Sequence, residues 1–169
     1  CTCSAWGSTF LVEYKHMTPD KAAQVILLYF VGMAIGRFLS GVFSAKLHSW
    51  KIIGIGQCIL GVAMVLLFVP GSSFFCTLGL FCIGLGNGPL FPNFNYLAPE
   101  SFGKDVSQSV ISIQMAIAYV GIMLGPMFCG LLGQAVGMFI FPFYLLCAYL
   151  IMAVTTFYAQ KILHKHQTV

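Results

Sequence analysis

Long apolar stretches separated by short polar or turn-forming segments dominate this sequence. Uncharged stretches of about 20 residues are typical of helices that span a membrane. Thr18-Pro19-Asp20 is a helix start, with threonine as N-cap and proline at the first helical position. The first apolar stretch is already under way at Cys1, so we expect a truncated first helix and a chain that is a fragment. The pattern predicts six helices, which cover residues 1–12, 21–43, 52–69, 74–97, 106–132 and 138–160.

The fourth predicted helix has the most unusual composition. Proline frees backbone carbonyls, and each buried amide side chain needs hydrogen-bond partners. Such a helix is tolerated in a membrane only where it is buried among other helices or lines a wet cavity, so we expect it to form part of a cavity wall. A dinucleotide-binding loop would need a preceding strand and a G-x-G-x-x-G spacing, and neither is present. The unusual residues are Gly84, Gly86, Asn87, Gly88, Pro89, Pro92, Asn93 and Asn95.

Composition excludes a soluble fold. Of the 169 residues, 59% are hydrophobic and 7% are charged, whereas soluble domains carry about 25% charged residues. The formal net charge of +4 is small and scattered, so nucleic acid is not an expected partner. The seven cysteines lie mostly within apolar runs, which favours a role as small packing groups.

Ionisable side chains are missing from the middle of every predicted helix, because no Asp, Glu, Lys or His falls there. Proton-coupled carriers usually need an intramembrane titratable group, so a proton site would have to lie outside this chain. The sequence has no nucleophile–base pair and no metal-ligand spacing, so we expect neither an enzyme nor a bound cofactor. His164 and His166 fit a solvated tail better than a metal site.

Lysines are unevenly distributed between alternate loops. The loops on one side of the predicted bundle carry an excess of lysine, whereas those on the other side are uncharged or have balanced charge. Cytoplasmic loops usually carry the excess of Lys and Arg, so we expect the first side and the C-terminus to be cytoplasmic. The lysines on that side are Lys46, Lys51, Lys104, Lys161 and Lys165.

Amide and phenol side chains on the fourth and fifth helices are the candidate ligands for a solute. Asn87 falls nearest the middle of the membrane, and Gln114 and Tyr119 lie on the fifth helix. Gln114 and Tyr119 differ by about 140° around the helix axis, so we expect only one to face a cavity centre. Each amide could instead cross-link helices, because an interhelical amide bond is worth about 0.6–2 kcal/mol. Phe91 and Met115 could stack on a sugar, with core packing as the alternative.

Four short strings, in this order, resemble the major facilitator superfamily of transporters, and in particular its bacterial fucose-permease-like branch. The similarity extends over essentially the whole chain. One departure is Asn87-Gly88, where relatives often have a small or apolar pair, and it bears on the substrate more than on the fold. The strings are Trp6-Gly-Ser-x-x-Leu-Val12, Gly36-Arg37-Phe-Leu-Ser40-Gly41, Gly86-Asn-Gly-Pro-Leu-Phe-Pro92, and Phe102-Gly103 with Ser107-Gln108 and Gln114-Met-Ala-x-Ala-Tyr119-x-Gly121.

The resemblance implies an all-α membrane protein with two six-helix bundles around a central cavity, which rock to expose it to either side. Residues 1–169 would form the C-terminal half-domain, helices seven to twelve, of this twelve-helix fold. Helices seven, eight, ten and eleven would border the cavity or the other half, and helices nine and twelve would be outer supports. The expected partners are the missing N-terminal half, the lipid bilayer and a small-molecule substrate.

Small residues on the second and fifth helices fit this arrangement. Gly32, Gly36 and Ser40 form one stripe, and Gly121 and Gly125 form another, and such stripes let helices come close. We expect these glycines to lie where helices eight and eleven of the resembled fold meet the missing half.

Arg37 lies near the cytoplasmic end of the second helix. We expect it to act as a latch between the halves, because a carrier with two states needs contacts that are present in only one of them. Asn93 and Asn95 also lie nearer the cytoplasmic end, where capping or gating is the expected role.

The sequence therefore favours a secondary active transporter in the cell membrane that moves a small polar solute, such as a sugar, by alternating access. The alternative is a non-transporting multi-pass membrane scaffold or receptor-like protein. An integral membrane enzyme is disfavoured because the polar groups inside the helices are amides and not acids, bases or nucleophiles.

Overall fold

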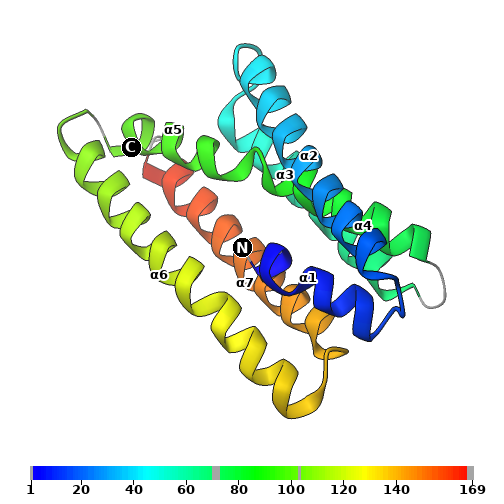
Figure 1. The fold of residues 1–169 in the computed structure, drawn as a ribbon. Coiled ribbons are helices and arrows are strands. Elements are labelled where there is room, and N and C mark those ends of the chain that lie inside the picture. Colours follow the sequence, from blue (N-terminus) through cyan, green and yellow to red (C-terminus); the bar gives the residue numbers. More distant parts are fainter. Residues whose placement is uncertain (1, 70–72, 103, 167–169) are drawn as a thin grey trace.

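The computed structural model describes residues 2–69, 73–102 and 104–166. Figure 1 shows an all-helical bundle, which confirms the predicted fold class, and the described residues contain no strand. Five segments are long and apolar enough to cross a membrane, and α4 and α5 together supply one of them. The helices are α1 (Thr2–Glu13), α2 (Pro19–Ser44), α3 (Ser49–Phe68), α4 (Ser73–Asn87), α5 (Leu90–Phe102), α6 (Lys104–Val136) and α7 (Ile140–His166).

The centre of the bundle is α4, which packs between α2 and α3 (Figure 1). Alternate glycines in and just after α4 allow this close packing on both sides. Gly84 and Gly88 lie about 40° apart around the helix, and Gly86 lies roughly opposite them. A methyl group at Gly88 would lie 2.6 Å from the carbonyl oxygen of Met33 on α2, whereas one at Gly86 would lie 2.7 Å from that of Gly56 on α3. Glycine on both sides of α4 therefore brings three backbones into direct contact.

Gly32 and Gly36, in the small-residue stripe of α2, contact α4 of this same chain. A methyl group at Gly32 would lie 2.5 Å from the Phe81 carbonyl oxygen, and one at Gly36 would overlap the Leu85 carbonyl oxygen. The stripe does permit close helix approach, as predicted, but the expected partner was wrong for these two glycines. The reason is that α4 presents its own glycines to the same groove, so the two backbones interlock within this chain.

The fourth predicted helix, residues 74–97, is two helices. The chain leaves helical geometry at Gly88 and Pro89, between α4 and α5. Pro89 has no N–H to offer the Leu85 carbonyl, so the hydrogen-bond ladder is interrupted there. Beyond the break, α5 continues past Pro99 to Phe102, where the sequence predicted a loop from residue 99. The two half-helices still follow one path across the bundle (Figure 1).

The turn between the last two helices is shorter than predicted. The uncharged stretch 133–137 was expected to be a turn, but α6 continues through it to Val136. Within this stretch Gly137 has a positive φ, of 109°, which a residue with a side chain rarely adopts. Glycine at this single position allows α6 to end and α7 to begin three residues later.

Trp6 belongs to the packing between α1 and α6. Its indole N–H donates a 2.7 Å hydrogen bond to the Pro126 carbonyl of α6. Its ring lies over Gly130, where a methyl group would overlap the indole. Tyr14, by contrast, is exposed at the start of the turn that follows α1.

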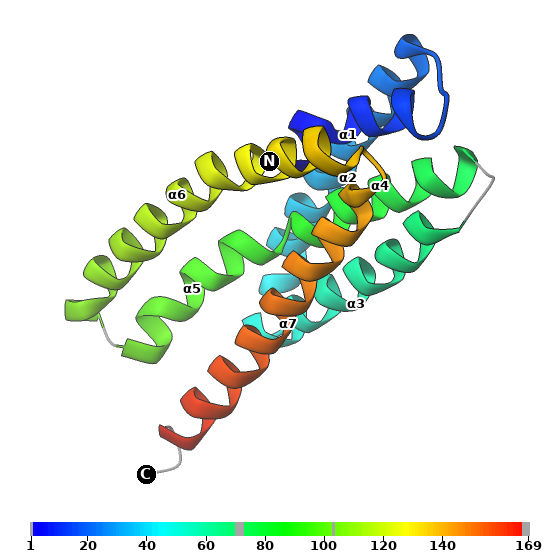
Figure 2. The same cartoon turned by 90° about the horizontal axis from the view of Figure 1, so that it is seen from below.

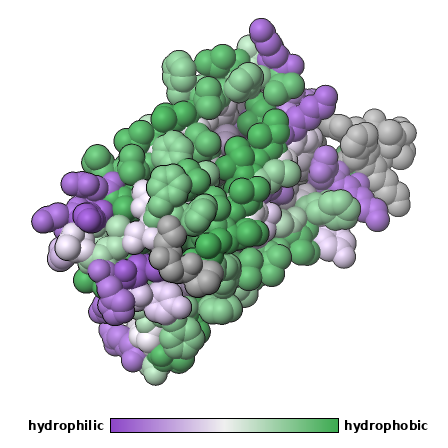
Figure 3. All heavy atoms as spheres, turned by 90° about the vertical axis from the view of Figure 1, so that its right-hand side faces the viewer, coloured by the Kyte–Doolittle hydropathy of each residue, from purple (hydrophilic) through white to green (hydrophobic). Residues whose placement is uncertain are grey.

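The outer surface has the distribution expected of a membrane-spanning bundle. Figure 3 shows hydrophobic side chains over the middle of one face and hydrophilic side chains towards its two ends. Large apolar side chains are exposed along α2, α3, α6 and α7. The longest helix, α6, is the least buried of the spanning segments, with 11% of its most apolar window inside the bundle. The chain is therefore a multi-pass membrane protein.

The connections divide between two ends of the bundle, as Figures 1 and 2 show. The α2–α3 connection and the ends of α5 and α7 lie towards one end, and the α1–α2 and α6–α7 connections lie towards the other. The lysine-rich loops predicted to be cytoplasmic thus share one end. A turn at residues 70–73 was also expected on the outer side; residues 70–72 lie outside the described residues, and Ser73 begins α4.

Cysteine labelling tests this sidedness. In a cysteine-free, full-length background, Lys46→Cys is expected to react with an impermeant maleimide only from the cytoplasmic side. Gln134→Cys, on the last turn of α6, is expected to react only from outside. The reverse pattern for both positions would overturn the assignment.

Candidate functional site

The three asparagines that follow one another in the chain have three different environments. Asn87 is exposed at the end of α4, Asn93 is fully buried, and Asn95 is half-buried on α5. The helix break separates Asn87 from the other two. Each amide therefore contacts a different neighbour, and each has its own chemical role.

Asn87 faces α2, where its side chain lies close to the Tyr29 hydroxyl. Tyr29 is among the most buried side chains in the bundle. Tyr29 was not identified from the sequence as a candidate site residue. A signal was available, because Tyr29 precedes Gly32, Gly36 and Ser40 at helical spacing and so lies on the same stripe of α2.

Arg37 follows Gly36 of this stripe directly in the sequence. Gly88 lies against the backbone of α2, and a methyl group there would lie 3.0 Å from the backbone nitrogen of Arg37. Arg37 thus lies beside the break between α4 and α5, and it is exposed. Tyr29, Asn87 and Arg37 form what we call the α2–α4 polar cluster.

Asn93 ties α5 to α2 from the other side of the break. Its Nδ2 donates to the Ser40 hydroxyl and to the Pro89 carbonyl, both at 2.6 Å. A carbonyl oxygen only accepts hydrogen bonds, so the atom facing Pro89 is the amide nitrogen. The Oδ1 of Asn93 is buried and has no hydrogen-bond partner among the described residues. Asn93 is therefore a helix cross-link, which is closer to the predicted capping role than to a ligand for solute.

Asn95 and Gln114 form a second amide link, between α5 and α6. Gln114 Nε2 donates to Asn95 Oδ1 at 3.1 Å, and the pair is half-buried. This bond uses one atom of each amide. Within the described part of the chain, Gln114 Oε1 and Asn95 Nδ2 have no partner, so the pair offers one acceptor and one donor to a ligand.

The two faces of α6 differ as the helical wheel predicts. Gln114 is half-buried on the side that packs against the bundle, whereas Tyr119 is 67% exposed. Met115 is half-buried, and Phe91 on α5 is 40% exposed. The structure thus places Gln114 and Tyr119 on different faces. No hydrogen bond among the described residues joins Asn87, Gln114 and Tyr119 into one cluster.

The glycines of α6 also differ from each other. Around Gly121 there is open space, whereas a methyl group at Gly125 would contact Thr2 on α1 at 3.4 Å. The Gly125 carbonyl also accepts a 2.9 Å hydrogen bond from the Tyr144 hydroxyl of α7. Gly125 therefore belongs to the packing of α1, α6 and α7, and Gly121 lies on the open face of α6.

The chemistry of these groups suits binding by hydrogen bonds. Their side chains are amides, hydroxyls and one guanidinium, and none is a carboxylate. Among the described residues, no group of three or more His, Cys, Asp or Glu side chains could hold a metal ion. Apart from the Arg37 guanidinium, the arrangement offers uncharged donors and acceptors, at one place on each side of the helix break.

Comparisons with known proteins agree with the membrane fold. The sequence model of the Major Facilitator Superfamily matches residues 2–167. Over 156 residues the chain is 23% identical to "Bypass of stop codon protein 6" of Saccharomyces cerevisiae (strain ATCC 204508 / S288c), a match that covers 86% of this chain and 31% of the yeast protein. The chain thus spans less than a third of this relative. No solved structure matches.

Proposed function

We propose that this chain, which belongs to the major facilitator superfamily, forms the C-terminal half of a secondary active transporter for a small polar solute. Members of the family are in general membrane transporters and not enzymes, so the scaffold or receptor-like alternative is not favoured. The fucose-permease-like branch, the C-terminal position and the location in the cell membrane are parts of the proposal that rest on the sequence strings.

The observation that best supports a polar, uncharged solute is the Asn95–Gln114 pair. Gln114 lies about 15 Å along α6 from Lys104, so the pair is about halfway across a 30 Å hydrocarbon core. An unpaired amide at this depth is costly unless water or a ligand reaches it. A hydroxyl group can donate to Gln114 Oε1 and accept from Asn95 Nδ2 together, which matches a sugar better than an anion.

Asn87 offers a second contact from α4. Asn87 is exposed and lies close to the Tyr29 hydroxyl, so donor and acceptor positions of its amide are open to a solute. Tyr119 and Phe91 are both well exposed and could supply ring surfaces to the same solute. In this proposal, rocking of the two halves brings these groups around the solute in one state.

Transport by the full-length protein in proteoliposomes tests the function. We expect uptake of at least one neutral sugar from a panel of radiolabelled hexoses, deoxyhexoses and pentoses. A panel of the corresponding sugar acids is the comparison. Uptake of sugar acids alone would contradict the neutral-solute proposal and would direct attention to Arg37.

Alanine substitution tests the amides. Gln114→Ala and Asn87→Ala are each expected to weaken equilibrium binding of the transported sugar by a few-fold to about a hundredfold, because a lost hydrogen bond costs about 0.5–1.5 kcal/mol and an unpaired buried partner costs more. Tyr119→Phe is expected to have a smaller effect because the ring remains. Binding is measured on purified full-length protein, since uptake also depends on rocking.

A matched control uses another glutamine on the same helix. Gln134 is exposed on the last turn of α6, so Gln134→Ala is expected to leave binding unchanged. If Gln114→Ala and Asn87→Ala both bind like the parent protein, the two amides are helix cross-links and the solute binds elsewhere.

A further inference from the structure

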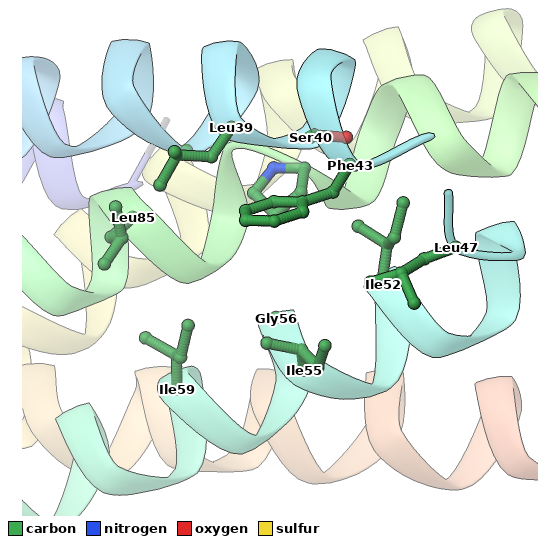
Figure 4. Close-up of a pocket in the computed structure, with 11 residues that line it drawn as sticks. Leu39, Ser40, Phe43, Leu47, Ile52, Ile55, Gly56, Ile59 and Leu85 are labelled. Carbon is green, nitrogen blue, oxygen red and sulfur yellow. The ribbon is translucent and has the colours of Figure 1, made fainter. Parts of the chain in front are cut away.

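An apolar groove opens between α2 and α3, near the loop that connects these two helices. It has a volume of about 340 Å³. Figure 4 shows side chains of α2 and α3 pointing towards each other across it, with Leu85 of α4 at the left. The lining is apolar except for the Ser40 hydroxyl, and its main side chains are Leu39, Phe43, Ile52, Ile55, Ile59 and Pro89.

The position of α4 explains why the groove exists. Because α4 packs between α2 and α3, these two helices hardly touch each other along their length. Gly36 and Gly56 lie in the groove walls and contribute no side chain to fill it. Ile52 and Ile59 are seven residues apart, so the α3 wall is about 10 Å long.

The length and lining of the groove limit its occupant. Its α3 wall is only about 10 Å long, and its lining is apolar apart from one hydroxyl. A flexible, narrow, apolar chain fits such a groove. In a membrane-spanning bundle, the abundant molecules of that kind are lipid acyl chains.

The charge at the end of the groove is positive. Leu47 and Ile52 line this end, and their neighbours Lys46 and Lys51 are both exposed. Among the acidic residues whose side chains the structure describes, Asp20 is the nearest along α2. It lies 24 residues before Ser44, which is about 36 Å of helix. The two lysines are therefore not neutralised by described acids, and a lipid phosphate at the membrane surface would lie within their field.

We propose that this groove binds an anionic glycerophospholipid, with one acyl chain between α2 and α3 and its headgroup phosphate at Lys46 and Lys51. The apolar lining supplies the affinity for the chain, and the lysines supply the preference for a negative headgroup. This site is separate from the α2–α4 polar cluster and does not depend on the identity of the transported solute.

Native mass spectrometry of the delipidated, full-length protein tests the proposal. Phosphatidylserine and phosphatidylcholine with the same acyl chains are the two probes. At the first binding site, phosphatidylserine is expected to bind about tenfold more tightly, because its headgroup has a net negative charge whereas that of phosphatidylcholine is neutral, and each lysine near an anionic headgroup contributes about 1 kcal/mol. Lys46→Gln combined with Lys51→Gln is expected to remove most of this preference. Equal affinity for the two lipids in the parent protein would overturn the proposal.

Two matched controls separate the groove from general effects. Lys15→Gln with Lys21→Gln makes the same charge change at the other end of the bundle and is expected to leave the preference intact. Ile55→Trp fills the groove and is expected to weaken both lipids about fivefold or more, as expected when apolar contact area is lost. Val62→Trp adds the same bulk to an exposed position on α3. Unchanged lipid binding by Ile55→Trp would overturn the proposal, because the lipid would then bind outside the groove.

Discussion

Replacing Gly36 with leucine is expected to prevent the bundle from assembling. The first side-chain atom would overlap the Leu85 carbonyl oxygen, which is backbone and cannot move aside as a flexible side chain can. Overpacking typically costs 1–3 kcal/mol where side chains can adjust, so we expect about 3 kcal/mol or more here. The measurement is the yield of monodisperse full-length protein in detergent, together with its thermal midpoint. Gly84→Leu is expected to behave in the same way, because its side chain would meet the Tyr29 carbonyl oxygen.

Other glycines of the same chain are the matched controls. Gly41 on α2 and Gly54 on α3 have open space where a side chain would be placed. Gly41→Leu and Gly54→Leu are therefore expected to give normal yields. If Gly36→Leu were as stable as Gly41→Leu, the close contact between α2 and α4 would be wrong. Gly121 is also in open space, so Gly121→Leu with normal yield but impaired transport would support contact with the proposed N-terminal half.

Asn93→Ala is expected to be the most damaging substitution among the polar residues. It removes two hydrogen bonds of 2.6 Å and leaves a small cavity in a site that has no exposure to solvent. The combined cost is expected to be about 2–4 kcal/mol in the free energy of unfolding. Ser40→Ala is expected to cost less, about 0.5–1.5 kcal/mol, because Asn93 retains its bond to the Pro89 carbonyl.

A double-mutant cycle separates the cross-link from the effect of volume. If the bond between Asn93 and Ser40 matters, the two alanine substitutions together are expected to cost less than the sum of their separate costs. Ser112→Ala is the control, since its hydroxyl bonds only within α6 and is exposed. Strict additivity of Asn93→Ala and Ser40→Ala would show that the bond contributes nothing to stability.

The membrane fold could be predicted from hydrophobic runs because backbone hydrogen bonding leaves a spanning segment few alternatives to a helix. Thr18 and Pro19 also mark the start of α2, as the sequence predicted. The ends of the other helices were harder to predict. Gly133 and Pro99 are frequent in turns, yet α6 and α5 continue through them, because packing and the remaining hydrogen bonds outweigh one unfavourable residue.

The partners of the small and polar residues could not be predicted from the sequence. A stripe such as Gly32 and Gly36 shows that a backbone comes close, but it does not say which one. Likewise, an amide in an apolar helix requires a partner, but the sequence alone does not show that Asn93 reaches Ser40 whereas Asn95 reaches Gln114. These pairings depend on the break at Pro89, which sets the direction of α5.

The break between α4 and α5 also bears on the order in which the protein is assembled as it leaves the ribosome. The N-terminal segments are made first, so α2 is already in the membrane when α4 and α5 enter it. Asn93 can therefore meet Ser40 at once. Gln114 is synthesised 19 residues after Asn95, so the Asn95 amide enters the bilayer before its partner exists. The apolar α4 is therefore expected to carry α5 into the membrane during this interval.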